Sequence, residues 1–115
     1  VLAGNYDILS IQIYFALVNS SGSRVGTELR VTSNSYTSDR PDIDWAGDHW
    51  GVVWADTRGN GAFDVYYSRI GASGSKETGD VRITTSTSNS YATSLAWNGT
   101  HHTFANRTET GFQCL

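Results

Sequence analysis

One acidic loop in this sequence approaches the ligand pattern of a calcium site. Its oxygen-bearing side chains, Asp56, Asn60 and Asp64, flank Gly61 at spacings close to those of a calcium-binding loop. Arg58 stands where the second ligand would be, however, and its cationic guanidinium repels a metal ion. We therefore expect no cofactor, and calcium is the only one that the residue types suggest. We predict that Asp56 and Arg58 pair to lock the loop, and that Asp64 caps the next strand.

The tryptophans are candidates for stacking against sugar rings, because aromatic side chains combine an apolar body with a polar tip. Trp45, Trp54 and Trp97 fall within apolar strand candidates, and we predict that these three pack in the core. Trp50 lies next to a hairpin turn, and we predict that it is the exposed one.

The histidines His49, His101 and His102 are the remaining side chains with metal-binding chemistry. All three lie at predicted hairpin positions, and no cysteine or carboxylate stands at a ligand spacing from them. We therefore expect solvated surface histidines. Cys114 is the only cysteine, so no disulfide can form within the chain.

Composition excludes several functional classes. The chain has 115 residues, the size of one domain, and 8 basic against 11 acidic residues give no cationic surface for nucleic acid. No run of 18 apolar residues is present, so no membrane span is predicted. Ser and Thr number 27, Pro occurs once and Met is absent, which favours an all-β chain.

The sequence repeats itself at an interval of 52 residues without a gap. The aligned pairs include Tyr14 with Tyr66, Arg30 with Arg82, Thr32 with Thr84, Trp45 with Trp97, and His49 with His101. Because Tyr, Trp and His are uncommon, their coincidence in one register indicates a structural repeat. We predict one unit over residues 1–115, with repeats at 13–64 and 65–115.

The repeats contain short strand candidates and no segment with a helical period. Read from the inner strand outward, one complete set of four consists of Pro41–Ala46, Trp50–Trp54, Phe63–Ile70 and Val81–Thr84. Four strands in about 50 residues is the spacing of a β-propeller blade.

Two incomplete sets lie on either side of this blade. The N-terminal one has a third and a fourth strand, and the C-terminal one a first and a second: Ile13–Val18 and Thr27–Val31, then Thr93–Trp97 and His101–Ala105. The predicted fold class is all-β, with β-propeller blades of four antiparallel strands and one complete blade flanked by two half-blades.

The two half-blades are complementary, because one has the first two strands of a blade and the other has the last two. Propellers usually have four to eight blades, so the two blades of one chain cannot close a ring. Head-to-tail pairing predicts a homo-oligomer with two blades per chain, and six blades favour a trimer. A lone chain would expose the apolar faces that carry Ile13, Phe15, Leu95 and Trp97. The alternative is that the chain is a piece of a longer propeller.

The segment from Trp45 to Ile70 resembles the repeat of secreted bacterial β-propellers of the sialidase-like kind. In that family a hydrophobic strand ends in Trp-x-Asp-x-Arg, here Trp54 to Arg58, and the next begins Asp-Val-Tyr, here Asp64 to Tyr66. The resemblance implies an extracellular or cell-surface location in a bacterium. The second repeat departs from the motif, with Asn106, Thr108 and Thr110 in the places of Trp54, Asp56 and Arg58.

Two functions are consistent with these patterns. The first is a non-catalytic binding or interaction module, with carbohydrate as the suggested ligand and Trp50, Arg40, Asp42 and Tyr36 as the candidate ligand-binding residues. The alternative, implied by the resemblance, is a fragment of a sialidase-like glycoside hydrolase. Sialidases use several arginines, a Tyr with a Glu, and an Asp, and the spacing of Arg40, Asp42 and Tyr36 does not assemble that set. We therefore expect no catalytic residue.

Overall fold

The computed structural model describes residues 11–85, 87–108 and 111–114, without the side chains of 92–93 and 106–114. These residues form β-strands and no helix, so no helix that could cross a membrane is among them. The strands are β1 (Tyr14–Val18), β2 (Arg24–Arg30), β3 (Ser38–Trp45), β4 (His49–Asp56), β5 (Asp64–Gly71), β6 (Val81–Arg82), β7 (Ser90–Trp97), β8 (His102–Thr108) and β9 (Gly111–Cys114).

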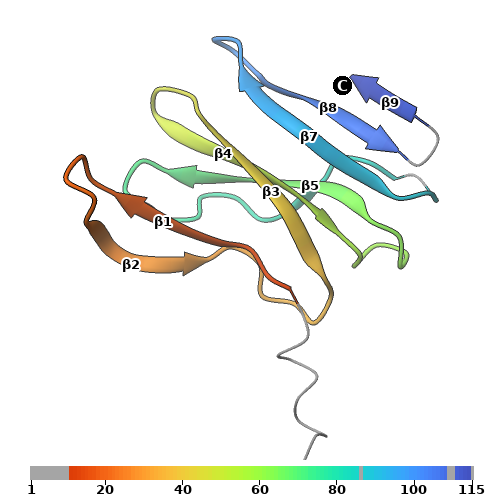
Figure 1. Ribbon diagram of the computed structural model, residues 1–115, viewed down its shortest axis with the longest axis horizontal. Helices are drawn as coiled ribbons and strands as arrows, with labels where there is room; N and C mark the ends of the chain where they lie inside the picture. Colours follow the sequence, from red (N-terminus) through yellow and green to blue (C-terminus); the bar gives the residue numbers. More distant parts are fainter. Residues whose placement is uncertain (1–10, 86, 109–110, 115) are drawn as a thin grey trace, which may run out of the picture.

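The strands form three antiparallel sheets, which lie next to one another with the largest in the middle (Figure 1). Their strand orders are β1-β2, β3-β4-β5-β6 and β7-β8-β9. The all-β class and the order of the four-stranded sheet are therefore confirmed. The C-terminal part was predicted to supply two strands, but it supplies three, because β9 pairs with the second half of β8. No sheet closes on itself within the described part of the chain.

The middle sheet is buried on both faces. On one face of β4, Val52 and Trp54 pack against Ile13 and Phe15 from the segment of β1. On the other face, Val53 packs against Leu95 of β7. This two-sided burial explains why the sequence of β4 is an almost continuous apolar run instead of an alternating one.

The burial of these faces corrects one expectation. Ile13, Phe15 and Leu95 were expected to be exposed in a lone chain, but they are 4%, 8% and 8% exposed. The outer sheets fold over the middle sheet within a single chain, so these apolar faces are covered without a second chain. Trp97 is half-buried.

The same hydrogen bonds recur at the interval of the sequence repeat. The hydroxyl of Thr32 accepts from the backbone N–H of Ile13 at 2.9 Å, and the hydroxyl of Thr84 accepts from that of Val65 at 2.9 Å. The arginine two residues before each threonine donates to its carbonyl, at 2.7 and 3.0 Å. The aligned Arg and Thr residues thus perform the same local task, which is to hold the end of one strand against its neighbour.

A glycine permits a close approach between the middle sheet and the sheet of β7, β8 and β9. A Cβ atom at Gly51 of β4 would lie 2.6 Å from Nε2 of His102, which is far inside van der Waals contact. The His102 ring therefore rests on the backbone of β4, and only a residue without a side chain leaves room for it.

Gly51→Ala is expected to lower the free energy of unfolding by about 1–3 kcal/mol, because the new methyl group displaces the His102 ring. Denaturation in urea measures this difference. Gly79→Ala is the matched control, since a Cβ there meets no atom within 4 Å, and its effect should stay within about 1 kcal/mol. Equal stability of both variants would contradict the close packing at Gly51.

Candidate functional site

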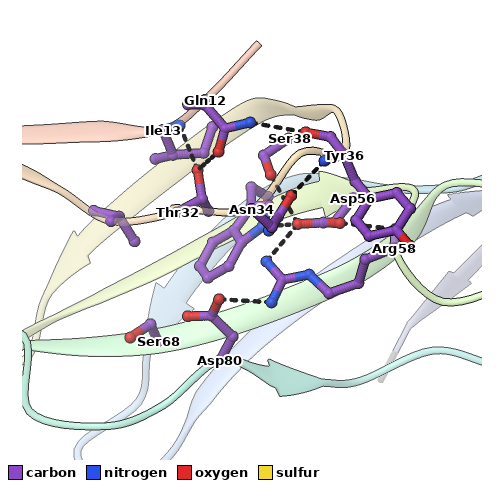
Figure 2. Close-up of polar contacts among 12 residues, drawn as sticks. Gln12, Ile13, Thr32, Asn34, Tyr36, Ser38, Asp56, Arg58, Ser68 and Asp80 are labelled. Atoms are coloured by element: carbon purple, nitrogen blue, oxygen red, sulfur yellow. Dashed lines mark hydrogen bonds and ion pairs between the residues drawn. The ribbon is translucent and has the colours of Figure 1, made fainter. Parts of the chain in front are cut away.

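A buried polar cluster centres on the carboxylate of Asp56, the last residue of β4 (Figure 2). Its Oδ2 accepts from Ser38 Oγ at 2.8 Å, from Trp54 Nε1 at 3.0 Å and from Arg58 Nη2 at 2.6 Å. Strand geometry brings these groups together, because Ser38 is the cross-strand partner of Asp56, and Trp54 lies two residues earlier on the same face. The predicted pairing of Asp56 with Arg58 is confirmed.

The cluster continues from Arg58 to the N-terminal sheet. Nη1 of Arg58 donates to Asp80 Oδ2 at 2.8 Å, and the other oxygen of Asp80 accepts from the ammonium group of Lys76. Lys76 Nζ also donates to the carbonyl oxygen of Val31 at 2.8 Å. The guanidinium of Arg58 stacks over the ring of Tyr66 at 4.6 Å. This series of contacts, in which two basic groups balance two acidic ones, therefore joins the middle sheet to Val31, the residue directly after β2.

The charge state of Asp56 follows from these contacts. Burial by itself raises the pKa of the carboxyl group, but the hydrogen bonds from Arg58, Trp54 and Ser38 together outweigh it. The pKa of Asp56 therefore lies below its ordinary value of 3.8, and the group is ionised at neutral pH. Such a stabilised, fully enclosed carboxylate is suited to holding structure together.

The other proposed calcium ligands are also engaged within the chain. Asp64 Oδ2 accepts from Arg82 Nη2 at 2.6 Å, and its Oδ1 accepts from the hydroxyl of Thr84 at 2.9 Å. Asn60 Oδ1 accepts from the backbone N–H of Ala62 at 3.1 Å. Within the described ranges, no group of three or more His, Cys, Asp or Glu side chains is arranged to hold a metal ion.

The candidate ligand-binding residues do not form one site. Trp50 pairs with Trp45 at the far end of β3, five residues beyond Arg40, which is about 16 Å along a strand. Asp42 lies between them and lines a groove beside β1. The side chain of Tyr36 is 51% exposed, ahead of β3.

Arg40 has a conformation that sequence reasoning missed. Its φ is 54°, in the left-handed region that residues other than glycine rarely adopt. It lies within the register shift between Asp39 and Asp42, and such a bulge re-aims a side chain. The guanidinium lies 4.1 Å from the ring centre of Tyr91 on β7, so Arg40 makes a cation–π contact between two sheets.

The exposure of two tryptophans is the reverse of the prediction. Trp45 is 41% exposed, whereas Trp50 is half-buried, and their ring centres lie 4.7 Å apart. The reason is that Phe15 of β1 packs edge-on against Trp50, at 6.1 Å between ring centres, while Trp45 is on the edge strand β3. Trp54 is fully buried, as predicted.

The histidines also differ from the expectation of solvated side chains. His101 is exposed, but the side chains of His49 and His102 are only 5% and 8% exposed. The Nε2 atoms of these two residues lie 3.1 Å apart, across the contact between β4 and β8. The sequence carried one signal for this pair, namely Gly51 two residues after His49, which makes room for the incoming ring. A pocket of about 360 Å³ opens beside the pair.

The chain matches no known protein family, no curated protein and no solved structure. Its function is therefore inferred from its own geometry. Thr110, and the side chains of Asn106, Thr108 and Cys114, lie outside the part of the chain that the structure describes.

Asp56→Asn is expected to reduce the loss of stability in acid. A carboxylate whose pKa is lowered by folding stabilises the folded state above its ordinary pKa of 3.8, and this contribution is lost as the pH falls below that value. Urea denaturation at pH 7 and at pH 3 should show a smaller difference for the variant than for the wild-type chain. The variant should also be less stable at pH 7, by about 1.5–3 kcal/mol, because Arg58 loses one of its two carboxylate partners and keeps Asp80.

Glu28→Gln is the control for this titration, because Glu28 is an exposed carboxylate on β2. It should stay within about 0.5 kcal/mol of the wild-type chain at pH 7. An unchanged acid dependence in Asp56→Asn would show that other carboxylates control acid unfolding.

Proposed function

We propose that this chain is a non-catalytic β-propeller interaction module that associates with further copies of itself. The observation that carries the proposal is the unequal pairing of β1 and β5, which occupy equivalent positions of the 52-residue repeat. Among the strands that the structure describes, β5 has β4 on one side and β6 on the other, whereas β1 has only β2. An unpaired strand edge is a template for pairing with another strand.

The free edge of β1 carries backbone groups that can accept a strand. The carbonyl of Ile13 accepts from Val31 N at 2.8 Å, so the polar backbone groups of Ile13 face β2. Successive residues of a strand direct these groups to opposite sides, and those of Tyr14 and Ala16 therefore face the free edge.

An apolar groove of about 280 Å³ runs beside this edge, between β1 and β3. Its walls include Phe15 and Ala16 of β1, Ile43 of β3 and Val52 of β4. A free edge next to an apolar groove supports β-strand addition, in which backbone bonds supply affinity and side-chain pockets supply specificity.

The repeat identifies the strand that would fit. In the middle sheet the inner neighbour of β5 is β4, and the equivalent of β4 in the second repeat is β8. Within residues 11–85, 87–108 and 111–114, β9 pairs with Ala105–Thr108, and no described strand pairs with the same side of β8 from His102 to Phe104. In the middle sheet, Ser68 of β5 lies opposite Val52 of β4. The repeat aligns Ser68 with Ala16 and Val52 with Phe104, so the same register would place Ala16 of one copy opposite Phe104 of the next.

Repeated pairing of this kind gives two blades per chain, and a trimer gives six blades, within the range in which propellers close. The resemblance to secreted propellers adds an extracellular or cell-surface location in a bacterium to the proposal. If the chain belongs to a longer protein, further repeats of that protein would occupy the same edge, and the isolated chain would remain monomeric.

Sedimentation equilibrium is expected to give a multiple of the 12.5 kDa chain mass, with three chains favoured. Ala16→Pro should convert this species to a monomer, because proline removes an N–H at the edge and blocks strand pairing. Ala16→Ser keeps the N–H and serves as the control. A wild-type chain that stays monomeric at every concentration would contradict self-association.

Carbohydrate is the ligand class that a second observation favours. Trp45 is 41% exposed and packs on Trp50, so a flat indole face is held in place at the surface. Such a face can stack on the apolar side of a sugar ring. Ile43, two residues earlier on β3, is 44% exposed and extends the apolar surface beside it.

Trp45→Ala is expected to weaken oligosaccharide binding about three- to tenfold, which corresponds to the loss of one aromatic stacking contact. A glycan array identifies the sugar, and titration of intrinsic fluorescence measures its affinity. Val81→Ala is the control, since Val81 is an apolar residue on β6 that is 48% exposed. The absence of any glycan bound by the wild-type chain would reject this ligand class and leave the self-association result unaffected.

A further inference from the structure

A pocket of about 360 Å³ lies between the middle sheet and the sheet of β7, β8 and β9. Its walls include Tyr67 of β5, Trp97 of β7 and Phe104 of β8, three aromatic side chains that are each half-buried. Leu95 also lines the pocket and is 8% exposed. A volume of this size, bounded mainly by apolar rings, is in the range of small-molecule sites.

The sequence repeat shows what is unusual about this pocket. In the first repeat, three apolar residues pack at the contact between β1 and the middle sheet, namely Phe15, Leu17 and Trp50. Each has a more polar equivalent in the second repeat that lines the pocket, namely Tyr67, Arg69 and His102. Polar groups at a contact between sheets lose solvation, so three such changes do not serve packing alone. They indicate a surface that meets a ligand.

Two histidines hold the aromatic wall in place. Nε2 of His49 lies 3.1 Å from Nε2 of His102, a hydrogen bond in which one neutral ring donates to the other. The centre of the His102 ring lies 4.8 Å from that of Trp97 and 5.9 Å from that of Tyr67. His49 packs edge-on against Trp97, with 5.5 Å between ring centres. Rings that are positioned before a ligand arrives lower the entropic cost of binding it.

Arg69 of β5 supplies a directional polar contact. Its Nε donates to Oε1 of Glu77 at 2.6 Å, and its Nη2 lies 3.9 Å from Oδ2 of Asp48, too far for a hydrogen bond. The Nη groups can therefore donate to a ligand, and the planar guanidinium can direct two N–H groups at one acceptor. Because Glu77 and Asp48 already balance the charge of Arg69, an uncharged acceptor suits the site.

We propose that this pocket binds a small planar aromatic molecule with an uncharged hydrogen-bond acceptor, such as a carboxamide. The ring packs against Trp97 and Tyr67, and the carbonyl oxygen accepts from Arg69. Contacts between aromatic rings stabilise beyond the burial of apolar area. A sugar ring is a poorer fit, because walls of this kind leave several of its hydroxyl groups without partners. The residues of the site all belong to one chain, so binding does not depend on self-association.

Titration of the purified chain with benzamide, followed by NMR of the backbone and indole N–H groups, tests the proposal. Benzamide is expected to bind saturably with a dissociation constant of about 1 mM, as suits so small a ligand. The indole N–H of Trp97 should shift, and that of Trp45 should not. Cyclohexanecarboxamide has the same acceptor without a flat ring, and it should bind about two- to tenfold more weakly.

The repeat supplies a matched pair of variants for the aromatic wall. Trp97→Leu keeps an apolar side chain and removes the aromatic face, and it should weaken benzamide binding about three- to tenfold. Trp45→Leu is the control, because Trp45 is the equivalent residue of the first repeat and makes the equivalent cross-strand contact, with Trp50, at 4.7 Å. This variant should bind benzamide as the wild-type chain does.

A second pair of variants separates ligand contact from structure at Arg69. Arg69→Gln removes the donating fork and should weaken benzamide binding about tenfold. Glu77→Gln breaks the same ion pair but leaves the guanidinium in place, so it should bind benzamide at least as tightly as the wild-type chain.

Three results would overturn the proposal. The first is the absence of saturable benzamide binding. The second is an equal loss of affinity within either pair, Trp97→Leu with Trp45→Leu or Arg69→Gln with Glu77→Gln. The third is tighter binding of glucose than of benzamide, which would assign the pocket to a sugar. None of these results alters the outcome expected from sedimentation.

Discussion

The structure depends on the burial of β4 on both of its faces. Trp54 packs toward the N-terminal sheet and Val53 toward the C-terminal sheet, and both are 0% exposed. Neither outer sheet could cover both faces alone, because consecutive residues of a strand point in opposite directions. The three sheets therefore stabilise one another through β4 together with β5, whose Tyr66 and Ile70 join the cluster toward the N-terminal sheet and whose Val65 joins the one toward the C-terminal sheet. Burial of this apolar area favours their packing.

Burial of β4 also determines what its polar residues must do. A charged or polar group at either end of a buried strand has to find partners, since an unpaired one destabilises the fold. Asp56 at the C-terminal end is neutralised by Arg58, which leads through Asp80 and Lys76 to the N-terminal sheet. His49 at the other end meets His102 of the C-terminal sheet. Apolar contacts hold the sheets together, and these polar contacts specify how the sheets are aligned.

The proposed self-association uses an edge of the fold that this arrangement leaves without a described neighbour. β1 covers the middle sheet with one face, and at the edge opposite β2 it has no neighbour among the described strands. The histidine pair lies at the opposite side of the middle sheet, where the packing of two sheets confines two basic nitrogens.

The sequence by itself determined the strands other than β9, the strand order in the middle sheet, and the pairing of Asp56 with Arg58. These features are local, because they follow from alternation, turn residues and a spacing of two residues between the paired charges. The exposure of Trp45, the burial of Phe15 and the meeting of His49 with His102 were decided only by the tertiary structure. Alternation shows which residues share a face of a strand, but a segment far away in the chain decides whether that face is covered. His102 lies 53 residues after His49, and only the stacking of two sheets brings their rings together.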